Sequence, residues 1–277
     1  MVFNDNVVPE FVLSNLEGRY DELRKMSSGD GARGGLNKQL IGDIVISYPS
    51  KAEQALIGSF FTKIDKSIAL HKQKIDLLKK YKRGIFQDVF KKINTNEILI
   101  DDVVDEYCEK TSKSNEYPIL SSTMSGITLQ NEYFGKQTAS QDTIGYKIVP
   151  YGFMTYRSMS DTGLFRFNLQ KIVEKGIVSP AYPVFKIKDE YNTLFIEYFL
   201  NETNYVKKQI RVLKEGGTRF ALSFSKFRNL TINLPSKKEQ DYIATLIDYF
   251  DNLIAQETLK LNYLRIYKKG LLQKMFI

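Results

Sequence analysis

The chain has 277 residues, 43% of them hydrophobic and 26% charged, and its 40 basic against 32 acidic residues give a net charge of +8. This composition is typical of a globular protein of about two domains, so it excludes intrinsic disorder. No stretch reaches the ~18 to 20 apolar residues of a membrane span, the first residues lack a secretory signal, and Cys108 and His71 are the single cysteine and histidine. We therefore expect a cytoplasmic protein with no membrane partner, no disulfide, and neither a zinc site nor a histidine-based triad.

A first long helix is predicted over residues 49–92, preceded by a short strand at Ile44 to Tyr48. Ser50 and Glu53 form a capping-box pattern at its start. Its apolar residues follow a heptad spacing that His71 and Lys82 complete: Ile57, Phe61, Ile64, Ile68, Ile75, Leu78 and Ile85. Thirty helical residues span about 45 Å, too long for one small core, so the helix needs a partner.

Residues 93–234 are predicted to fold as an α+β domain with a twisted, mixed sheet. Short β-rich segments bounded by Gly and Pro predict strands, and a longer apolar run predicts a helix. The strands are Ile144 to Val149, Gly152 to Arg157, Gly163 to Leu169 and Tyr182 to Ile187, followed by a helix over Tyr191 to Ile210 and a strand at Leu230 to Leu234.

A second long helix, residues 235–277, repeats the first at an offset of 186 residues. Its capping box is Ser236 and Glu239, and its seam matches that of the first helix, with Glu257 at the position of His71. We predict that the two helices form an antiparallel coiled coil. In symmetric register His71 would face Glu257 and set the register rather than do chemistry; two exposed polar side chains would be the plainer alternative.

Two regions are basic: residues 50–92, with eleven basic and four acidic residues, and residues 110–234. They favour a polyanionic partner such as double-stranded DNA, although a lysine-rich helix face can simply be solvated. Arg, Lys and Gln contact base edges, and hydroxyl groups hold phosphates. The candidate DNA-binding residues are Ser122, Thr123, Lys136, Gln137, Tyr156, Arg157, Ser158, Lys175 and Arg219. Alternatively, the Ser-Thr-Gly clusters make turns and Tyr156 belongs to the core.

Catalytic motifs are absent from the sequence: it has no glycine-rich phosphate loop, no dinucleotide fingerprint and no amino-methyltransferase motif. Asp101, Asp102, Asp105, Glu106 and Glu109 are the only acidic run that suggests a Mg²⁺-dependent nuclease, but their spacing fits a solvated helix face. We expect no catalytic residue, no metal and no cofactor.

The duplicated pattern resembles the specificity subunit of type I restriction-modification systems. It consists of a Pro-x-x-x-Glu-Gln start, a heptad helix and a Lys-x-Gly-φ-φ-Gln-x-x-Phe end, where φ is apolar, at Pro49 to Phe90 and again at Pro235 to Phe276. The resemblance implies target recognition domains that each bind one half of a bipartite DNA site. It also implies conserved helices that dock modification (methyltransferase) subunits, a restriction subunit in the full complex, and no catalysis by the chain itself.

The chain departs from the family pattern in its first copy. Residues 1–48 resemble only the C-terminal remnant of a first recognition domain, so residues 49–92 would be the central conserved helix, 93–234 the one complete recognition domain and 235–277 the C-terminal conserved helix. The chain is then a truncated or phase-variable variant, a half-subunit that forms a homodimer to read a symmetric split site, or a recombination fragment inactive alone. A coiled-coil protein scaffold without DNA specificity is the alternative function.

Overall fold

The computed structural model describes residues 5–26, 38–92, 97–130, 142–213 and 220–276. The chain divides into two compact units: Met1–Lys82 with Phe250–Ile277 (unit 1), and Arg83–Tyr249 (unit 2). Two long helices, α4 (Lys51–Lys92) and α9 (Lys237–Met275), contribute residues to both units. Within the described ranges, no helix has the length and apolarity that crossing a membrane requires.

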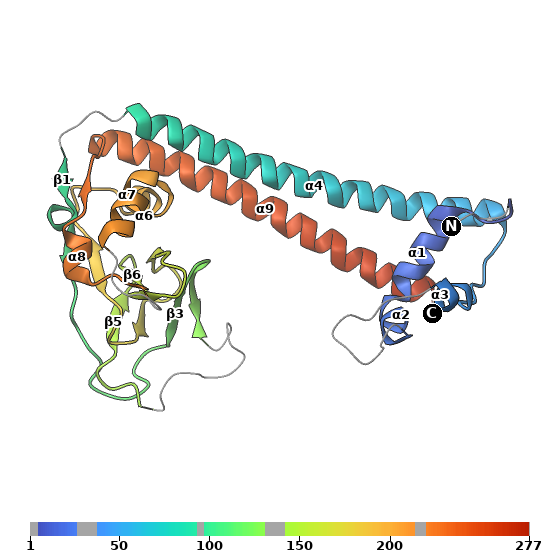
Figure 1. Ribbon diagram of the computed structural model, residues 1–277, viewed down its shortest axis with the longest axis horizontal. Helices are drawn as coiled ribbons and strands as arrows, with labels where there is room; N and C mark the ends of the chain where they lie inside the picture. Colours follow the sequence, from blue (N-terminus) through green and yellow to red (C-terminus); the bar gives the residue numbers. More distant parts are fainter. Residues whose placement is uncertain (1–4, 27–37, 93–96, 131–141, 214–219, 277) are drawn as a thin grey trace. The chain divides into compact units, whose positions relative to one another are not determined.

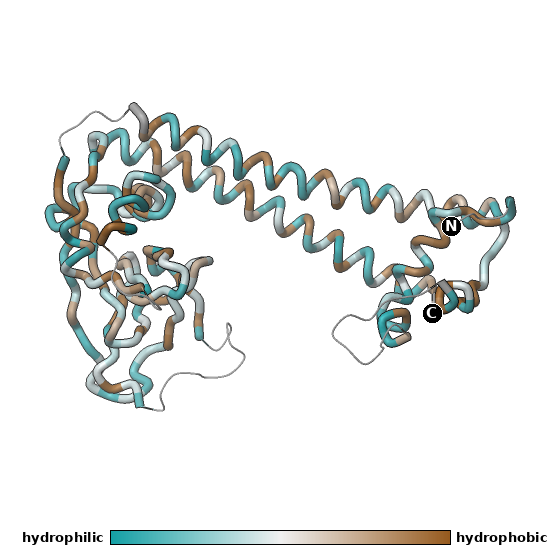
Figure 2. Tube along the Cα trace, viewed as in Figure 1, coloured by the Kyte–Doolittle hydropathy of each residue, from teal (hydrophilic) through white to brown (hydrophobic). Residues whose placement is uncertain are grey.

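In unit 1, α4 and α9 run side by side and antiparallel (Figure 1). Lys82 Nζ lies 2.6 Å from Asp251 Oδ1, and Lys268 Nζ lies 2.6 Å from Asp65 Oδ1. The two ion pairs are equivalent under the 186-residue repeat, and residue numbers rise along α4 as they fall along α9. Figure 2 shows apolar and polar residues alternating along both helices, as the heptad pattern predicts. The predicted antiparallel coiled coil is confirmed.

The predicted pair of His71 and Glu257 is also confirmed. Nδ1 of His71 lies 2.6 Å from Glu257 Oε2, while Oε1 of Glu257 accepts hydrogen bonds from Lys74 Nζ at 2.9 Å and Lys260 Nζ at 3.2 Å. The Glu257 residue is only 4% exposed. The bond from Lys74, followed by that from His71, lowers the pKa of the Glu257 carboxyl to about 2.

The lowered pKa of Glu257 predicts how the stability of the α4–α9 coiled coil changes in acid. Because the pKa of Glu257 lies below its ordinary value of 4.5, the stability that the carboxylate contributes is present above that value and is lost as the pH falls towards about 2. Glu257→Gln cannot ionise, so the advantage of the wild-type protein in urea denaturation should shrink across this window. A constant difference between the two proteins would show that the charge of Glu257 does not stabilise the pair.

Three short helices complete unit 1: α1 (Pro9–Gly18), α2 (Tyr20–Met26) and α3 (Lys38–Gly42). The buried side chain of Gln54 fixes α1 to the start of α4. Its Oε1 accepts from the Val8 backbone N–H at 3.0 Å, and its Nε2 donates to the Pro49 carbonyl at 2.9 Å. The ring of Phe11 packs edge-on against Phe276, with ring centroids 5.6 Å apart.

Unit 2 is built around a four-stranded antiparallel sheet with the strand order β2-β10-β6-β8. Strands β1 and β12, β3 and β4, β5 and β9, and β7 and β11 form antiparallel pairs, and an isolated parallel bridge joins Ile119 to Ile177. The strands are β1 (Ile98–Leu99), β2 (Val104–Glu106), β3 (Leu120–Thr123), β4 (Gly126–Leu129), β5 (Lys147–Pro150), β6 (Met154–Tyr156), β7 (Met159–Ser160), β8 (Phe167–Leu169), β9 (Lys175–Val178), β10 (Val184–Ile187), β11 (Phe220–Ala221) and β12 (Thr231–Ile232). The predicted α+β class is confirmed.

The core of unit 2 lies between this sheet, the helices α6 (Thr193–Glu202), α7 (Asn204–Leu213) and α8 (Phe224–Arg228), and the ends of α4 and α9. Gln240 repeats the role of Gln54: its Oε1 accepts from the Asn192 N–H and its Nε2 donates to the Pro235 carbonyl, both at 2.9 Å. Phe90 packs on Phe195 as Phe276 packs on Phe11, with centroids 6.0 Å apart. Each unit thus contains the same joint, in which a buried glutamine at the start of a long helix holds the start of a short helix, α1 in unit 1 and α6 in unit 2.

Three predicted elements differ from the structure. The helix predicted over Tyr191 to Ile210 is interrupted at Thr203, whose Oγ1 donates to the Phe199 carbonyl. The strand predicted at Ile44 to Tyr48 is an extended segment without strand pairing among the described residues. The acids of residues 101–109 lie on a 3₁₀ turn (Ile100–Asp102), on β2 and in the segment that follows, rather than on a helix face.

Candidate nucleic-acid interface

A hollow of about 710 Å³ opens on unit 2. The β3–β4 hairpin forms one wall, and β7 with the loop that precedes β8 forms another. Hydroxyl groups dominate the lining, together with two arginines. The lining residues are Ile119, Leu120, Ser121, Ser122, Thr123, Met124, Ser125, Gln130, Tyr146, Arg157, Met159, Ser160, Asp161, Thr162, Leu164, Phe165, Arg166, Ser179 and Tyr182.

The charged residues of the lining are two arginines and Asp161. Arg157 is exposed in the turn between β6 and β7. Arg166 precedes β8 and lies 3.1 Å from Glu202 through its Nη1, which leaves Arg157 as the more accessible cation. The exposed apolar side chains of Met124, Met159 and Leu164 also line the hollow. This mixture of cations, hydroxyls and apolar atoms suits phosphate, sugar and base contacts.

Two buried polar atoms of the lining residues lack hydrogen-bond partners among the described residues. They are Nε of Arg166, which can only donate, and Oε1 of Gln130, which can only accept. Both atoms are buried beneath the surface of the hollow, so the groups that DNA could reach there are the exposed ones, Arg157 above all.

Three of the predicted DNA-binding residues meet in this hollow: Ser122, Thr123 and Arg157. The hydroxyl of Ser122 is buried and accepts from Asn168 Nδ2 at 2.8 Å, while Thr123 Oγ1 donates to the Gly126 carbonyl and closes the hairpin. The hairpin therefore positions these two hydroxyls firmly. Lys136, Gln137 and Arg219 lie outside the described residues.

Two predicted residues lie elsewhere in unit 2. Lys175 is on β9, where its Nζ lies 5.7 Å from the centre of the Tyr117 ring and forms a cation–π contact. Ser158 is half-buried, and its carbonyl accepts from the Leu222 N–H at 2.9 Å. Neither residue lines the hollow.

The prediction that Tyr156 contacts DNA is wrong. Its side chain is fully buried among Phe167, Phe185 and Phe227, and its hydroxyl donates to the Leu222 carbonyl at 3.1 Å. Burial raises the pKa of the phenol well above its ordinary value. Alternation along β6 places Tyr156 on the core face, whereas Arg157 follows the strand and is exposed.

Tyr156→Phe tests this assignment. The variant removes the donor to a buried carbonyl, so we expect a loss of about 1 to 3 kcal/mol in the free energy of unfolding. Because the ring stays in the core, DNA affinity should not change under conditions where the variant is folded. Urea denaturation and fluorescence anisotropy with duplex DNA measure the two quantities, and reduced affinity in the folded variant would contradict the core role.

The model of the family described as type I restriction modification DNA specificity domain matches residues 86–264, more than half of the chain. The chain belongs to this family. It is therefore a DNA sequence-specificity subunit of a type I restriction-modification system. The sequence resemblance is thereby confirmed.

Solved structures show the same fold. The S subunit of the type I restriction-modification system from M. genitalium has a TM-score of 0.61 and 14% identity, over 97% of this chain and 72% of that chain. A chain from a study of complex assembly and conformational transition of the type I R-M system has a TM-score of 0.57 and 14% identity, over 98% of this chain and 72% of that chain.

Sequence reasoning missed most of the lining residues of this specificity subunit, among them Arg166 and Gln130. The one signal that Arg166 offered was a basic side chain within the strand predicted at Gly163 to Leu169, and its place near Arg157 follows from the pairing of β6 with β8. Gln130 offered no such signal. Its place in the lining depends on the pairing of β3 with β4, which no local pattern reveals.

The acidic run of the specificity subunit does not form a metal site. The carboxylate of Asp101 forms an ion pair with Arg228, which holds its pKa below the ordinary value. Within the part of the chain that the structure describes, no three acidic, histidine or cysteine side chains converge in a way that suits a metal ion.

Proposed function

We propose that this specificity subunit reads one half of a bipartite DNA site through the hollow of unit 2. The observation that carries the proposal is the meeting of exposed Arg157 with the hydroxyl-bearing residues of the β3–β4 hairpin in one hollow. Arg157 would hold a phosphate or a base edge.

Arg157→Ala tests the DNA contact, with Arg211→Ala as the matched control because Arg211 is exposed on α7 and is not among the lining residues. If Arg157 binds a phosphate, its removal should weaken binding to duplex DNA and reduce the slope of log affinity against log salt by about 1. Anisotropy titrations at several salt concentrations, with and without the modification subunit, measure both. Equal slopes for the two variants would remove Arg157 from the interface.

We propose further that residues 1–48 correspond to the C-terminal part of a first recognition domain, residues 49–92 and 235–277 to the two conserved helices, and residues 93–234 to the recognition domain. The repeated joint at Gln54 and Gln240 supports this division. It implies that residues 5–26 correspond to residues 189–210 of the complete domain.

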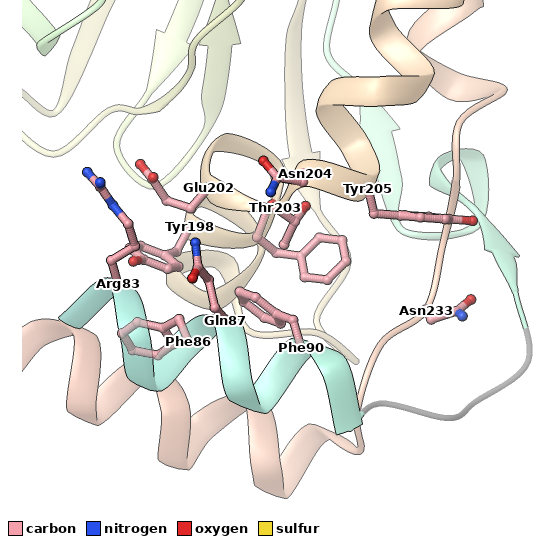
Figure 3. A pocket seen from close by; sticks show the side chains of 11 residues that line it. Arg83, Phe86, Gln87, Phe90, Tyr198, Glu202, Thr203, Asn204, Tyr205 and Asn233 are labelled. Carbon is pink, nitrogen blue, oxygen red and sulfur yellow. Dashed lines mark hydrogen bonds between the residues drawn. The ribbon is translucent and has the colours of Figure 1, made fainter. Parts of the chain in front are cut away.

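The long helices are proposed to dock the modification subunits, with a restriction subunit joining the complex. In unit 1, α9 exposes a second apolar stripe, Leu259, Tyr263 and Ile266, at heptad spacing outside the seam with α4. In unit 2, a hollow of about 340 Å³ lies between the end of α4 and the α6–α7 pair; Arg83, Gln87 and Glu202 surround its aromatic floor of Phe86, Phe90 and Tyr198 (Figure 3). An exposed apolar stripe such as the one on α9 is typical of protein interfaces.

Co-purification with the modification subunit tests the docking. Tyr263→Ser together with Ile266→Ser should weaken the complex, whereas Val212→Ser, at an exposed apolar position of α7, should not.

Because a site of two halves needs two readers, we also propose that two copies of the chain associate as half-subunits. A coiled-coil scaffold without DNA specificity would instead bind its partner and leave DNA unshifted.

A further inference from the structure

The two short helices α1 and α2 of unit 1 are a second copy of α6 and α7 of unit 2, but the two copies have different neighbours. Helices α1 and α2 correspond to α6 and α7, and α3 corresponds to α8. The extended segment Ile44–Tyr48 corresponds to Leu230–Leu234 under the 186-residue repeat. We call these elements of unit 1, α1 to α3 and Ile44–Tyr48, the cap.

In unit 2, the sheet covers the elements that correspond to the cap. There the equivalent residues Phe227, Leu230, Ile232 and Leu234 are buried in the main core against the sheet. In unit 1 their counterparts Ile41, Ile44 and Ile46 are only half-buried, and Tyr48 is 55% exposed where Leu234 is 7% exposed. These side chains, with Val7, Val12 and Leu16, line an apolar groove of about 280 Å³. The cap therefore leaves a core-forming face uncovered by the described residues.

The backbone of the cap shows the same contrast. One edge of the extended segment is occupied in both units, since the Val45 carbonyl accepts from Arg19 Nη1 at 2.7 Å and the Thr231 carbonyl accepts from Gln209 Nε2 at 2.7 Å. The other edge of the unit 2 segment pairs antiparallel with β1, where Ile100 N–H donates to the Leu230 carbonyl at 2.8 Å. Among the described residues, no strand pairs with this edge in unit 1.

The composition of the segment selects its occupant. Ile44, Val45, Ile46, Ser47 and Tyr48 carry no charge and favour strand structure, so nothing repels an identical segment. Antiparallel pairing of two copies about Ile46 would place Ile44 of one chain opposite Tyr48 of the other. This aliphatic–aromatic pair is a favourable cross-strand contact. The two apolar faces would then lie on the same side of the ribbon, because residues i, i+2 and i+4 share a face.

We propose that the cap of unit 1 is a self-association surface, on which a second copy of this chain pairs its Ile44–Tyr48 segment antiparallel about a two-fold axis at Ile46. The inference rests on the proposed association of half-subunits and identifies its interface. A two-fold contact of this kind uses the same patch on both chains, so it closes at the dimer.

Sedimentation velocity of the full chain over a range of concentrations tests the interface. We expect a monomer–dimer equilibrium, and Ile46→Asp should weaken dimerisation by about tenfold or more, because two carboxylates would face each other at the axis. Val212→Asp, at an apolar position of unit 2 that is 84% exposed, should dimerise as the wild type does. A monomeric wild type, or equal weakening by both variants, would overturn the inference.

Disulfide trapping tests the register without relying on a destabilising variant. Cys108 is exposed, so the background is Cys108→Ser. Pairing about Ile46 places position 46 opposite itself and position 45 opposite position 47, so Ile46→Cys should crosslink several times faster than Val45→Cys under mild oxidation. Equal rates, or faster crosslinking of Val45→Cys, would contradict the proposed register.

The two proposals fail separately. A monomeric chain whose DNA binding still depends on Arg157 would refute the dimer interface and leave the proposed DNA reading intact. A dimer lost through Ile46→Asp, with DNA binding insensitive to Arg157→Ala, would refute the proposed DNA contact alone.

Discussion

Phe227→Ala is expected to lower the free energy of unfolding of unit 2 by about 3 to 5 kcal/mol, the usual range for removing a buried phenylalanine ring. Phe227 is fully buried, and its ring stacks on Phe167 with centroids 4.8 Å apart and contacts Tyr156 and Phe185 at 5.6 and 5.3 Å. Removal of its ring leaves a cavity between α8 and the sheet that the surrounding side chains cannot close completely.

Urea denaturation followed by far-ultraviolet circular dichroism measures this loss. Val212→Ala serves as the control, because its exposed side chain should change stability by no more than about 0.5 kcal/mol. If Phe227→Ala cost no more than this control, the aromatic cluster would not be the centre of the unit 2 core.

Two glycines of the same helix, α4, should respond to alanine with opposite signs. A Cβ atom at Gly58 would lie 2.8 Å from both Glu10 Cβ and the Phe11 backbone nitrogen, whereas a Cβ at Gly84 would meet nothing within 4 Å. Overpacking against backbone costs about 1 to 3 kcal/mol, and alanine gains about 1 kcal/mol over glycine inside a helix. We expect Gly58→Ala to destabilise by about 2 kcal/mol and Gly84→Ala to stabilise by about 1 kcal/mol.

Chemical denaturation of both variants measures the difference, and limited proteolysis near α1 shows whether Gly58→Ala releases that helix from α4. Stabilisation by Gly58→Ala would mean that α1 can move away from α4 without cost.

The long helices and their register could be predicted from the sequence because both depend on a repeating local signal. The heptad spacing fixes which residues form the seam, and the midpoint of each seam identifies His71 and Glu257 as partners. The repeat alone permits either orientation of the two helices, so the antiparallel arrangement was the favoured prediction rather than a consequence of the spacing.

The sheet and the site were less predictable because strand pairing joins distant residues. The positions of β6, β8 and β10 were found approximately, but nothing in the sequence says that β6 lies between the other two and buries Tyr156. The same limit applied to the hollow. Ser122 and Arg157 meet there only because the β3–β4 hairpin and the β6–β7 turn are brought together by the fold.

The equivalence of α1 and α2 with α6 and α7 could not be predicted from the sequence for a different reason. Helices α1 and α6 begin 184 residues apart, not 186, so a search at the offset of the long helices does not align them. Most of their side chains also differ, because α6 packs on a sheet, and only Phe11, Val12 and Leu16 of α1 keep the apolar character of their counterparts Phe195, Ile196 and Leu200. The equivalence is a matter of position rather than sequence.

The glutamine joints at Gln54 and Gln240 hold only main-chain atoms: the N–H of the residue before the first turn of α1 or α6 and a proline carbonyl. Val8 and Asn192, whose side chains share no chemistry, are both held through the backbone N–H. This hydrogen bond does not depend on the side chain that follows it, so the glutamine would accept a neighbouring helix of different sequence, and only the ring contacts of Phe11 with Phe276 and of Phe195 with Phe90 restrict that choice.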